Sequence, residues 1–151
     1  MSKGRIRLSE TVAGSPTMVF ALLTDLERSP EWDPRVSRVT QMTRGPLRAG
    51  VILRGTIAAN GEEYHLDDEV AEYDPPWHFG LRSVQGATEA ISYTLVEEAE
   101  GITRLDVSLS YDLPDPPAAS GLDDAALRQQ IADGLAQSLR VLKGLIERES
   151  A

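Results

Sequence analysis

The residue best suited to chemistry in this chain is Asp68, a carboxylate inside the alternating stretch EEYHLDDEVAEY. Successive side chains of a strand point to opposite faces, so the alternation tells which residues share a face with Asp68. They are Tyr64, Leu66 and Val70. A carboxyl group among apolar side chains has a raised pKa and can act as acid or base. Two plainer interpretations stay open: Asp68 bonds a neighbouring tyrosine, or it lies in water near the end of the strand.

The same alternation assigns inward positions on the three expected strands that follow. Their more apolar faces carry Trp77, Phe79, Leu81, Glu89, Ile91, Tyr93, Leu95, Leu105, Val107, Leu109 and Tyr111. This set is mostly apolar with a few polar groups, which is the usual composition of a small-molecule pocket. A bulge in any of these strands would reverse part of the assignment.

Other arrangements of polar side chains are weaker. His65 and Asp67 share a strand face and could supply two metal ligands, but a stable site needs three or four. His78 has no assured proximity to them, so we expect a solvated polar face and no metal. Arg54 is left open: if it points inward, it pairs with Asp68 or with an anionic ligand group.

The composition excludes several classes of function. The 151 residues fit one domain, residues 1–151, and their net charge of -9 opposes binding to nucleic-acid phosphates. The absence of cysteine excludes disulfides and thiolate chemistry. The N-terminus lacks the apolar run of a signal peptide, and no stretch approaches the roughly 20 apolar residues of a membrane helix. We therefore expect a cytoplasmic protein without stable membrane insertion.

The elements that must position these residues begin with a strand at Ile6 to Val12 and a helix in GSPTMVFALLTDL, which Ser15 can cap. One further short turn is expected around Trp32, between Pro30 and Pro34. Six strands follow, at residues 36–44, 51–59, 63–73, 77–84, 88–97 and 102–111. Asn60-Gly61 between the second and third of them is a strong hairpin signal.

A long helix is expected from Asp123 to Glu149. It carries a continuous apolar stripe, formed by Leu127, Ile131, Leu135, Leu139, Leu142 and Ile146. Gly134 and Gly144 interrupt this helix, and glycine costs about 1 kcal/mol in a helix interior. The two glycines therefore suggest either a close backbone approach or room left for another group; tolerated sequence drift is the alternative.

Three segments together resemble a known family: SPTMVFALLTDLERSPEWDPRV, EVAEYDPPWHFGLR and GITRLDVSLSYDLP. The whole chain resembles the START-related and birch-pollen-allergen-like superfamily, in its polyketide cyclase/dehydrase and lipid-transport branch. The resemblance implies an α+β helix-grip fold, in which a curved seven-stranded antiparallel sheet surrounds a long C-terminal helix, with a short helix pair after the first strand. It also implies an elongated cavity between sheet and helix, with Trp32 at its lid; alternatively, Trp32 only fills space beside the first helix.

The leading interpretation is a cofactor-free protein that binds a hydrophobic or aromatic small molecule in this cavity. The expected ligand contacts are Trp32, Tyr64, Leu66, Val70, Trp77, Phe79, Leu81, Glu89, Ile91, Leu109, Tyr111 and Leu135. One alternative is a polyketide aromatase/cyclase in which Asp68 and Tyr93 move protons. Another is a protein-interaction module that uses the outer surface of the sheet. A homodimer is left open, and no cofactor or nucleic-acid partner is expected.

Overall fold

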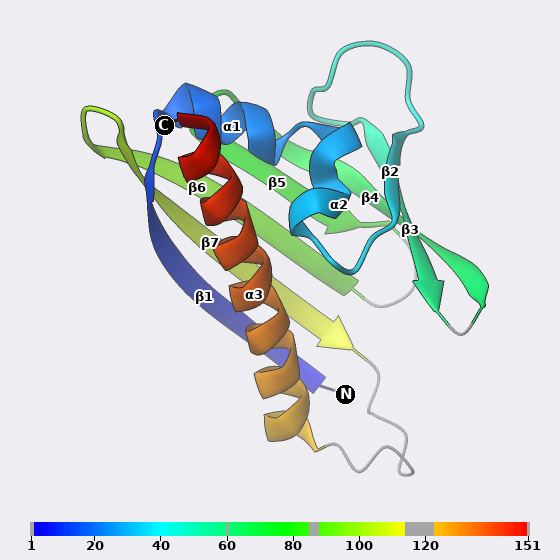
Figure 1. Cartoon of the computed structure of the whole chain (residues 1–151). Coiled ribbons are helices and arrows are strands. Elements are labelled where there is room, and N and C mark those ends of the chain that lie inside the picture. The colour runs from blue at the N-terminus through cyan, green and yellow to red at the C-terminus, as the bar shows by residue number, and fades with distance from the viewer. Residues whose placement is uncertain (1, 60, 85–87, 114–122, 151) are drawn as a thin grey trace.

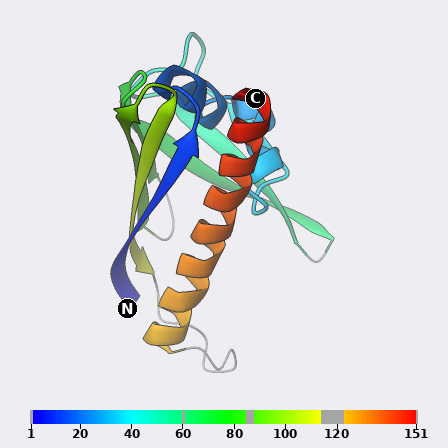
Figure 2. The same ribbon diagram turned by 60° about the vertical axis from the view of Figure 1, so that its left-hand side comes forward.

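The computed structural model describes residues 2–59, 61–84, 88–113 and 123–150, which form an antiparallel sheet with helices on one side of it (Figures 1 and 2). The elements are β1 (Ser2–Ala13), α1 (Pro16–Leu23), the 3-10 helix η1 (Leu26–Arg28), α2 (Ser29–Trp32), β2 (Arg38–Gln41), β3 (Ile52–Ala59), β4 (Glu62–Asp74), β5 (His78–Ser83), β6 (Thr88–Ala99), β7 (Ile102–Leu113) and α3 (Asp124–Ser150). The seven strands are ordered β1-β7-β6-β5-β4-β3-β2. The expected α+β fold, with its seven-stranded sheet and long C-terminal helix, is confirmed.

Strand β2 is shorter than expected: it covers Arg38–Gln41, whereas the sequence predicted residues 36–44. Beyond it the Gln41 side chain donates hydrogen bonds to the carbonyl oxygens of Thr43 and Gly45, at 2.7 and 2.6 Å. Gly45 has a φ of 99°, a conformation that favours glycine. These contacts and the positive φ shape the connection that follows β2. In the next connection Gly61 also has a positive φ, while Asn60 of the expected hairpin signal lies outside the described residues.

A bulge in β4 changes which side chains face the helices. Val70 pairs with Leu81 and Tyr73 pairs with Phe79, so the register shifts between them. The shift brings Tyr73 to the inner face, where its ring centroid lies 5.6 Å from that of Phe20. A bulge of this kind adds one residue to one strand only and exchanges its faces.

The expected inward position of Trp77 is wrong. Trp77 precedes β5, and its N–H donates to the Asp74 carbonyl at 2.7 Å, which closes a turn. The side chain is 40% exposed. Strand alternation therefore does not apply to this residue.

Helix α1 begins as the sequence indicates. The Ser15 hydroxyl accepts a hydrogen bond from the Met18 N–H at 3.2 Å, and Pro16 occupies the first turn, where no N–H is required. Val19 and Leu23 are buried, so α1 packs against the core that the sheet and α3 share.

Helix α3 is fastened at its C-terminal end. The Ala13 N–H donates to the Glu147 carboxylate at 2.9 Å, and the Ser150 hydroxyl donates to the Ala13 carbonyl at 2.7 Å. A Cβ atom at Gly14 would lie 2.7 Å from Ile146, so this glycine permits the close approach. Figure 2 shows this end of α3 beside the end of β1 and the start of α1.

The stripe expected on α3 is buried mainly in the C-terminal half of the helix. Leu135, Leu139, Leu142 and Ile146 belong to the core, and Ile131 packs against it from a partly buried position. The two helix glycines show no close backbone approach: a Cβ atom at Gly134 would meet nothing within 4 Å, and one at Gly144 only the Arg148 side chain.

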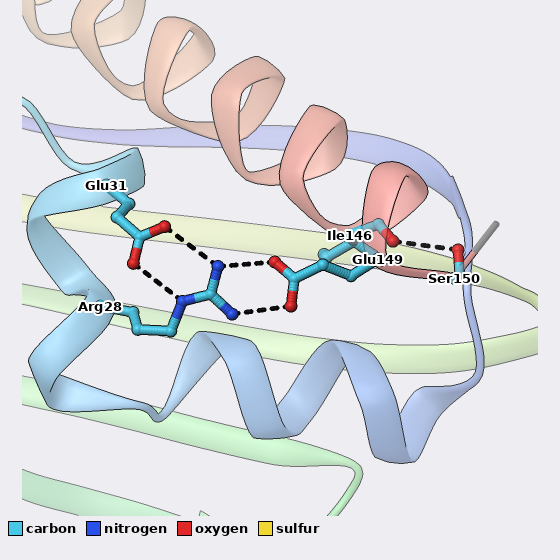
Figure 3. A network of polar contacts seen from close by, with 5 residues as sticks. All are labelled: Arg28, Glu31, Ile146, Glu149 and Ser150. Atoms are coloured by element: carbon cyan, nitrogen blue, oxygen red, sulfur yellow. Dashed lines mark hydrogen bonds and ion pairs between the residues drawn. The ribbon is translucent and has the colours of Figure 1, made fainter.

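Arg28 ties the short helices to α3. Its guanidinium donates to both carboxylate oxygens of Glu149, at 2.7 and 2.6 Å, and to Glu31 at 2.8 and 3.0 Å (Figure 3). Arg28 ends η1 and Glu149 lies in the last turn of α3, so the contact joins two segments far apart in the chain.

No helix in the described ranges is long and apolar enough to cross a membrane.

Candidate ligand cavity

A cavity of about 360 Å³ lies between the inner face of the sheet and the segment from α1 to β2. Its volume is within the range of small-molecule sites, about 300–1,000 Å³. Most of the lining is apolar: Leu23, Leu26, Trp32, Val36, Val39, Leu53, Gly55, Ile57, Leu66, Phe79, Leu81, Ile91 and Leu109. The polar lining residues are Ser29, Asp33, Arg35, Asp67, Asp68, Ser83, Glu89 and Tyr93.

The position of the cavity differs from the expected one. No side chain of α3 is among the lining residues of the described chain, and Leu135 is packed into the core instead. The apolar residues of α3 belong to the same core as residues of the sheet and of α1. The open volume lies beside α3, where only short helices and a connection cover strands β3 to β6 (Figure 1).

Trp32 lies at the cavity, as expected. It ends α2, is buried, and contributes to the lining together with Ser29 from the same helix. Its indole N–H has no acceptor within the described residues. A buried donor without a partner costs about 1–3 kcal/mol, so an acceptor that reached it would stabilise the fold.

The aromatic part of the lining comes from neighbouring strands. Phe79 of β5 and Tyr93 of β6 pair across the sheet, with ring centroids 6.3 Å apart and planes 21° from parallel. Phe20 of α1 contacts Phe79 edge-on at 6.3 Å. These rings give the cavity a firm, apolar wall beside the Tyr93 hydroxyl.

A polar row crosses three adjacent strands. Asp68 of β4 pairs with Ser83 of β5, whose hydroxyl accepts from the Glu89 N–H at 2.8 Å and donates to the Glu89 carbonyl at 3.1 Å. The carboxylates of Asp68 and Glu89 therefore lie on either side of Ser83. Neither carboxylate has a hydrogen-bond partner within the part of the chain that the structure describes.

The connection after α2 contributes an ion pair. Arg35 donates to both carboxylate oxygens of Asp33, at 3.1 and 3.2 Å. Arg35 borders the cavity, and 60% of its side-chain surface is accessible. Because Asp33 occupies two of its donor groups, Arg35 is largely neutralised within its own segment.

The environment raises the pKa of the Asp68 carboxyl to about 6. Desolvation is the largest cause, the negative charge of Glu89 adds to it, and Arg35 acts against both. Burial also raises the pKa of the Tyr93 hydroxyl, which is neutral at physiological pH. Asp68 can therefore exchange a proton near neutral pH, whereas Tyr93 keeps its proton and can donate a hydrogen bond inside the cavity.

The neighbouring polar residues of β3 and β4 are paired with one another, although Asp67 also belongs to the cavity lining. Arg54 donates to both oxygens of Asp67 at 2.8 and 3.0 Å, so it does not pair with Asp68. This contact lowers the pKa of Asp67. His65 contacts the Thr56 hydroxyl at 3.3 Å. Within the described residues, no three acidic or histidine side chains are grouped to hold a metal ion.

The structure brings nine of the expected site residues to the cavity: Trp32, Leu66, Asp68, Phe79, Leu81, Glu89, Ile91, Tyr93 and Leu109. Their roles in binding or proton transfer stay predictions. Five others lie elsewhere: Tyr64, Val70, Trp77, Tyr111 and Leu135.

Each misplaced residue has a local cause. Tyr64 has the expected parity, but the β3–β4 hairpin projects beyond the helices, so its side chain is 49% exposed and bonds Glu62 (Figure 1). Val70 is fully packed in the core. Tyr111 lies over Gly4 of the adjacent strand, where a Cβ atom would come within 2.4 Å of its hydroxyl oxygen.

Sequence reasoning missed Asp33 and Arg35. They immediately follow Trp32 in the proline-rich segment, so a tryptophan expected at the mouth of a cavity was the signal that could have placed them there. It also missed Ser83, because that strand was assigned from its apolar residues alone.

A family model described as polyketide cyclase / dehydrase and lipid transport matches residues 3–147. The chain belongs to this family. Comparison with curated protein sequences gives no match. Members of the polyketide cyclase/dehydrase and lipid-transport family typically bind hydrophobic ligands, and the cavity described above lies within the matched residues.

Solved structures agree on the fold. The START superfamily protein from Mycobacterium smegmatis is 16% identical with a TM-score of 0.78, over 95% of this chain and 97% of that one. The Zhui aromatase/cyclase from Streptomyces sp. R1128 is 15% identical with a TM-score of 0.78, over 99% and 96%. Ara h 8.0201 is 16% identical with a TM-score of 0.71, over 95% and 97%. These similarities establish the helix-grip fold.

Proposed function

We propose that this protein binds a hydrophobic or aromatic small molecule in the cavity between the sheet and the segment from α1 to β2. The observation that carries the proposal is an apolar cavity of about 360 Å³ that also contains polar side chains without partners. Apolar burial supplies the binding free energy, at roughly 25 cal/mol per Å² before the costs of association. The hydroxyl of Tyr93 and the carboxylates of Asp68 and Glu89 orient the polar end of the ligand.

The test uses N-phenyl-1-naphthylamine, a neutral probe whose fluorescence rises in apolar surroundings. Wild-type protein should bind it with saturation. Ile91 lines the cavity on the inner face of β6, so Ile91→Trp should fill the space and weaken binding by about tenfold or more. Ser92→Trp is the matched control, because it places the same ring on the opposite face of the same strand. Equal affinity in a folded Ile91→Trp variant would contradict the proposal.

A second candidate function is polyketide aromatisation or cyclisation. It is favoured by the carboxyl of Asp68, whose pKa of about 6 suits a general base near neutral pH, in a cavity shared with the Tyr93 hydroxyl. Asp68 would take a proton from the carbon between two carbonyls, and Tyr93 would donate a hydrogen bond to the developing enolate oxygen. Asp68→Asn should then abolish turnover of a linear poly-β-ketone while leaving binding of the neutral probe intact.

The interaction-module alternative receives less support. The outer faces of β6 and β7 carry Ser92, Thr94, Asp106 and Ser108, which form a polar surface. An apolar patch large enough for a protein partner would require apolar residues at these positions.

A further inference from the structure

We infer that the cavity selects ligands that carry a cationic amine at one end, and that it discriminates against fatty-acid-like carboxylates. This inference rests on the proposed function and adds the charge of the ligand to it. It is carried by the placement of polar side chains that have no partner in the described chain.

The charges that line the cavity do not cancel. Asp33 is paired with Arg35, and Asp67 is paired with Arg54. Asp68 and Glu89 remain without a cationic partner at hydrogen-bond distance. The cavity therefore holds two uncompensated acidic groups and no uncompensated cation among the described residues.

The two carboxylates are close enough to act on one group. They belong to strands on either side of β5, so their Cα atoms are about 10 Å apart, twice the usual strand spacing. Both residues line the cavity, and the negative charge of Glu89 acts on the Asp68 carboxyl. An ammonium group between them would donate charge-assisted hydrogen bonds to both.

A third group in the cavity lacks a partner. Tyr93 is only 5% exposed, lies on the same inner face of β6 as Glu89, and its hydroxyl has no hydrogen bond within the described residues. Its electrostatic neighbours are Asp33, Arg35 and Asp68, so the hydroxyl lies near the acidic groups. A buried hydroxyl of this kind can accept a hydrogen bond from an amine.

Arg35 does not make the site suitable for anions. Asp33 holds its Nε and Nη2 groups, and any carboxylate placed beside Arg35 would meet the field of Asp68 and Glu89. The rest of the lining is apolar and accepts an alkyl or aromatic body. The expected ligand is thus an apolar molecule with a protonated amine at the end near β4 to β6.

Three probes of equal chain length test the inference: decylamine, decanol and decanoate, each used to displace N-phenyl-1-naphthylamine at pH 7.5. Decylamine should bind best and decanoate worst, with about a tenfold or greater difference between these two, since hydrogen bonds to charged groups are the stronger ones. In Asp68→Asn combined with Glu89→Gln, this difference should fall to within about threefold, while the affinity for decanol changes less than the affinity for decylamine, because an alcohol carries no charge.

The control variant is Glu72→Gln, which removes one negative charge from an exposed position on the same strand as Asp68. It should keep the full preference for decylamine. The two single variants, Asp68→Asn and Glu89→Gln, should each lose part of the preference, so the result does not depend on the double variant alone.

The pH dependence gives a second measurement. Asp68 faces Glu89 from β6, Arg35 from the connection after α2, and its neighbour Asp67. An alkyl ammonium stays charged at neutral and acid pH, like lysine. The affinity for decylamine should therefore fall as the pH drops below 6 and Asp68 becomes protonated, whereas the affinity for the uncharged decanol should change less.

The failures of the two proposals can be told apart. If neither the naphthylamine probe nor any decyl compound binds, the proposed function is wrong. If the probe binds and decanoate competes as well as decylamine, the function stands and the inferred selectivity is overturned. If the double variant still prefers decylamine, the inferred selectivity is likewise overturned, because the negative charge that attracts the amine would then belong to residues other than Asp68 and Glu89.

Discussion

Removing the charge of Asp68 should stabilise the protein at neutral pH. The pKa of the carboxyl is about 6 in the folded state against an ordinary value of 3.8, so ionisation is harder after folding. A shift of this size corresponds to at most about 3 kcal/mol, and the partial contact of the group with cavity solvent reduces it to about 1–2 kcal/mol. Asp68→Asn keeps the shape of the side chain and removes this cost.

The direction in which stability changes with pH follows from proton binding to Asp68. Between about pH 4 and pH 6 the folded state holds a proton on Asp68 that the unfolded state has released, so wild-type stability falls as the pH rises. Below this range both states are protonated and the cost is absent, whereas above it the cost is constant. The free energy of unfolding of Asp68→Asn should thus rise relative to that of wild type from pH 4 to pH 7, and the difference should remain at pH 8.

Thermal and urea denaturation of both proteins at pH 4, 6 and 8 is the assay. An advantage of 1–2 kcal/mol corresponds to a melting temperature roughly 2–8 °C higher at pH 8. The matched control is Asp67→Asn. The contact with Arg54 lowers the pKa of Asp67, so wild type should exceed this variant at neutral pH and lose the advantage as Asp67 is protonated in acid.

The decisive result is that, at neutral pH, Asp68→Asn raises the free energy of unfolding and Asp67→Asn lowers it. If the difference in unfolding free energy between wild type and Asp68→Asn is the same at all three pH values, Asp68 is solvated and does not face the cavity. The polar row of β4 to β6 would then need another assignment.

Three further predictions concern the frame of the cavity. Gly4→Ala places a Cβ atom 2.4 Å from the Tyr111 hydroxyl oxygen and should lower stability by about 1–3 kcal/mol in urea denaturation. Gly134→Ala meets nothing within 4 Å inside α3 and should raise stability by about 0.5–1 kcal/mol; a loss would mean that the space beside this glycine is used. Arg28→Ala removes the contact between η1 and Glu149 of α3, which loosens the segment that carries Trp32, and should speed dissociation of the naphthylamine probe in stopped-flow displacement; an unchanged rate would contradict this.

Much of the fold could be predicted because its signals are local. Ser15 and Pro16 mark the start of α1, and residues at helical spacing from Leu127 to Ile146 mark the buried side of α3. The alternation in β6 and β7 assigned Ile91, Tyr93 and Leu109 to the inner face. Each of these signals depends on a few neighbouring residues and on the period of one element.

The errors arose where one element depends on another. The inner position of Tyr73 was not expected, because the bulge after Val70 is set by pairing with β5 and is not encoded in the residues of β4 alone. The partner of Arg54 follows from the register between β3 and β4. Whether α3 borders the cavity depends on how closely Leu135 and Leu139 approach the sheet, which is a property of the packed core.

Asp67 and Asp68 show how the surroundings determine the role of a carboxylate. They are adjacent and chemically identical, yet one is paired with Arg54 and has a lowered pKa, while the other faces the cavity and has a raised pKa. Asparagine or serine at position 68 would fit the same space without the cost of an unpaired charge. Strongly perturbed carboxylates are concentrated at functional sites, where stability is given up for binding or catalysis. Asp68 lowers the stability of the fold at neutral pH, and it is therefore the place in this cavity where we expect a ligand cation or a transferred proton.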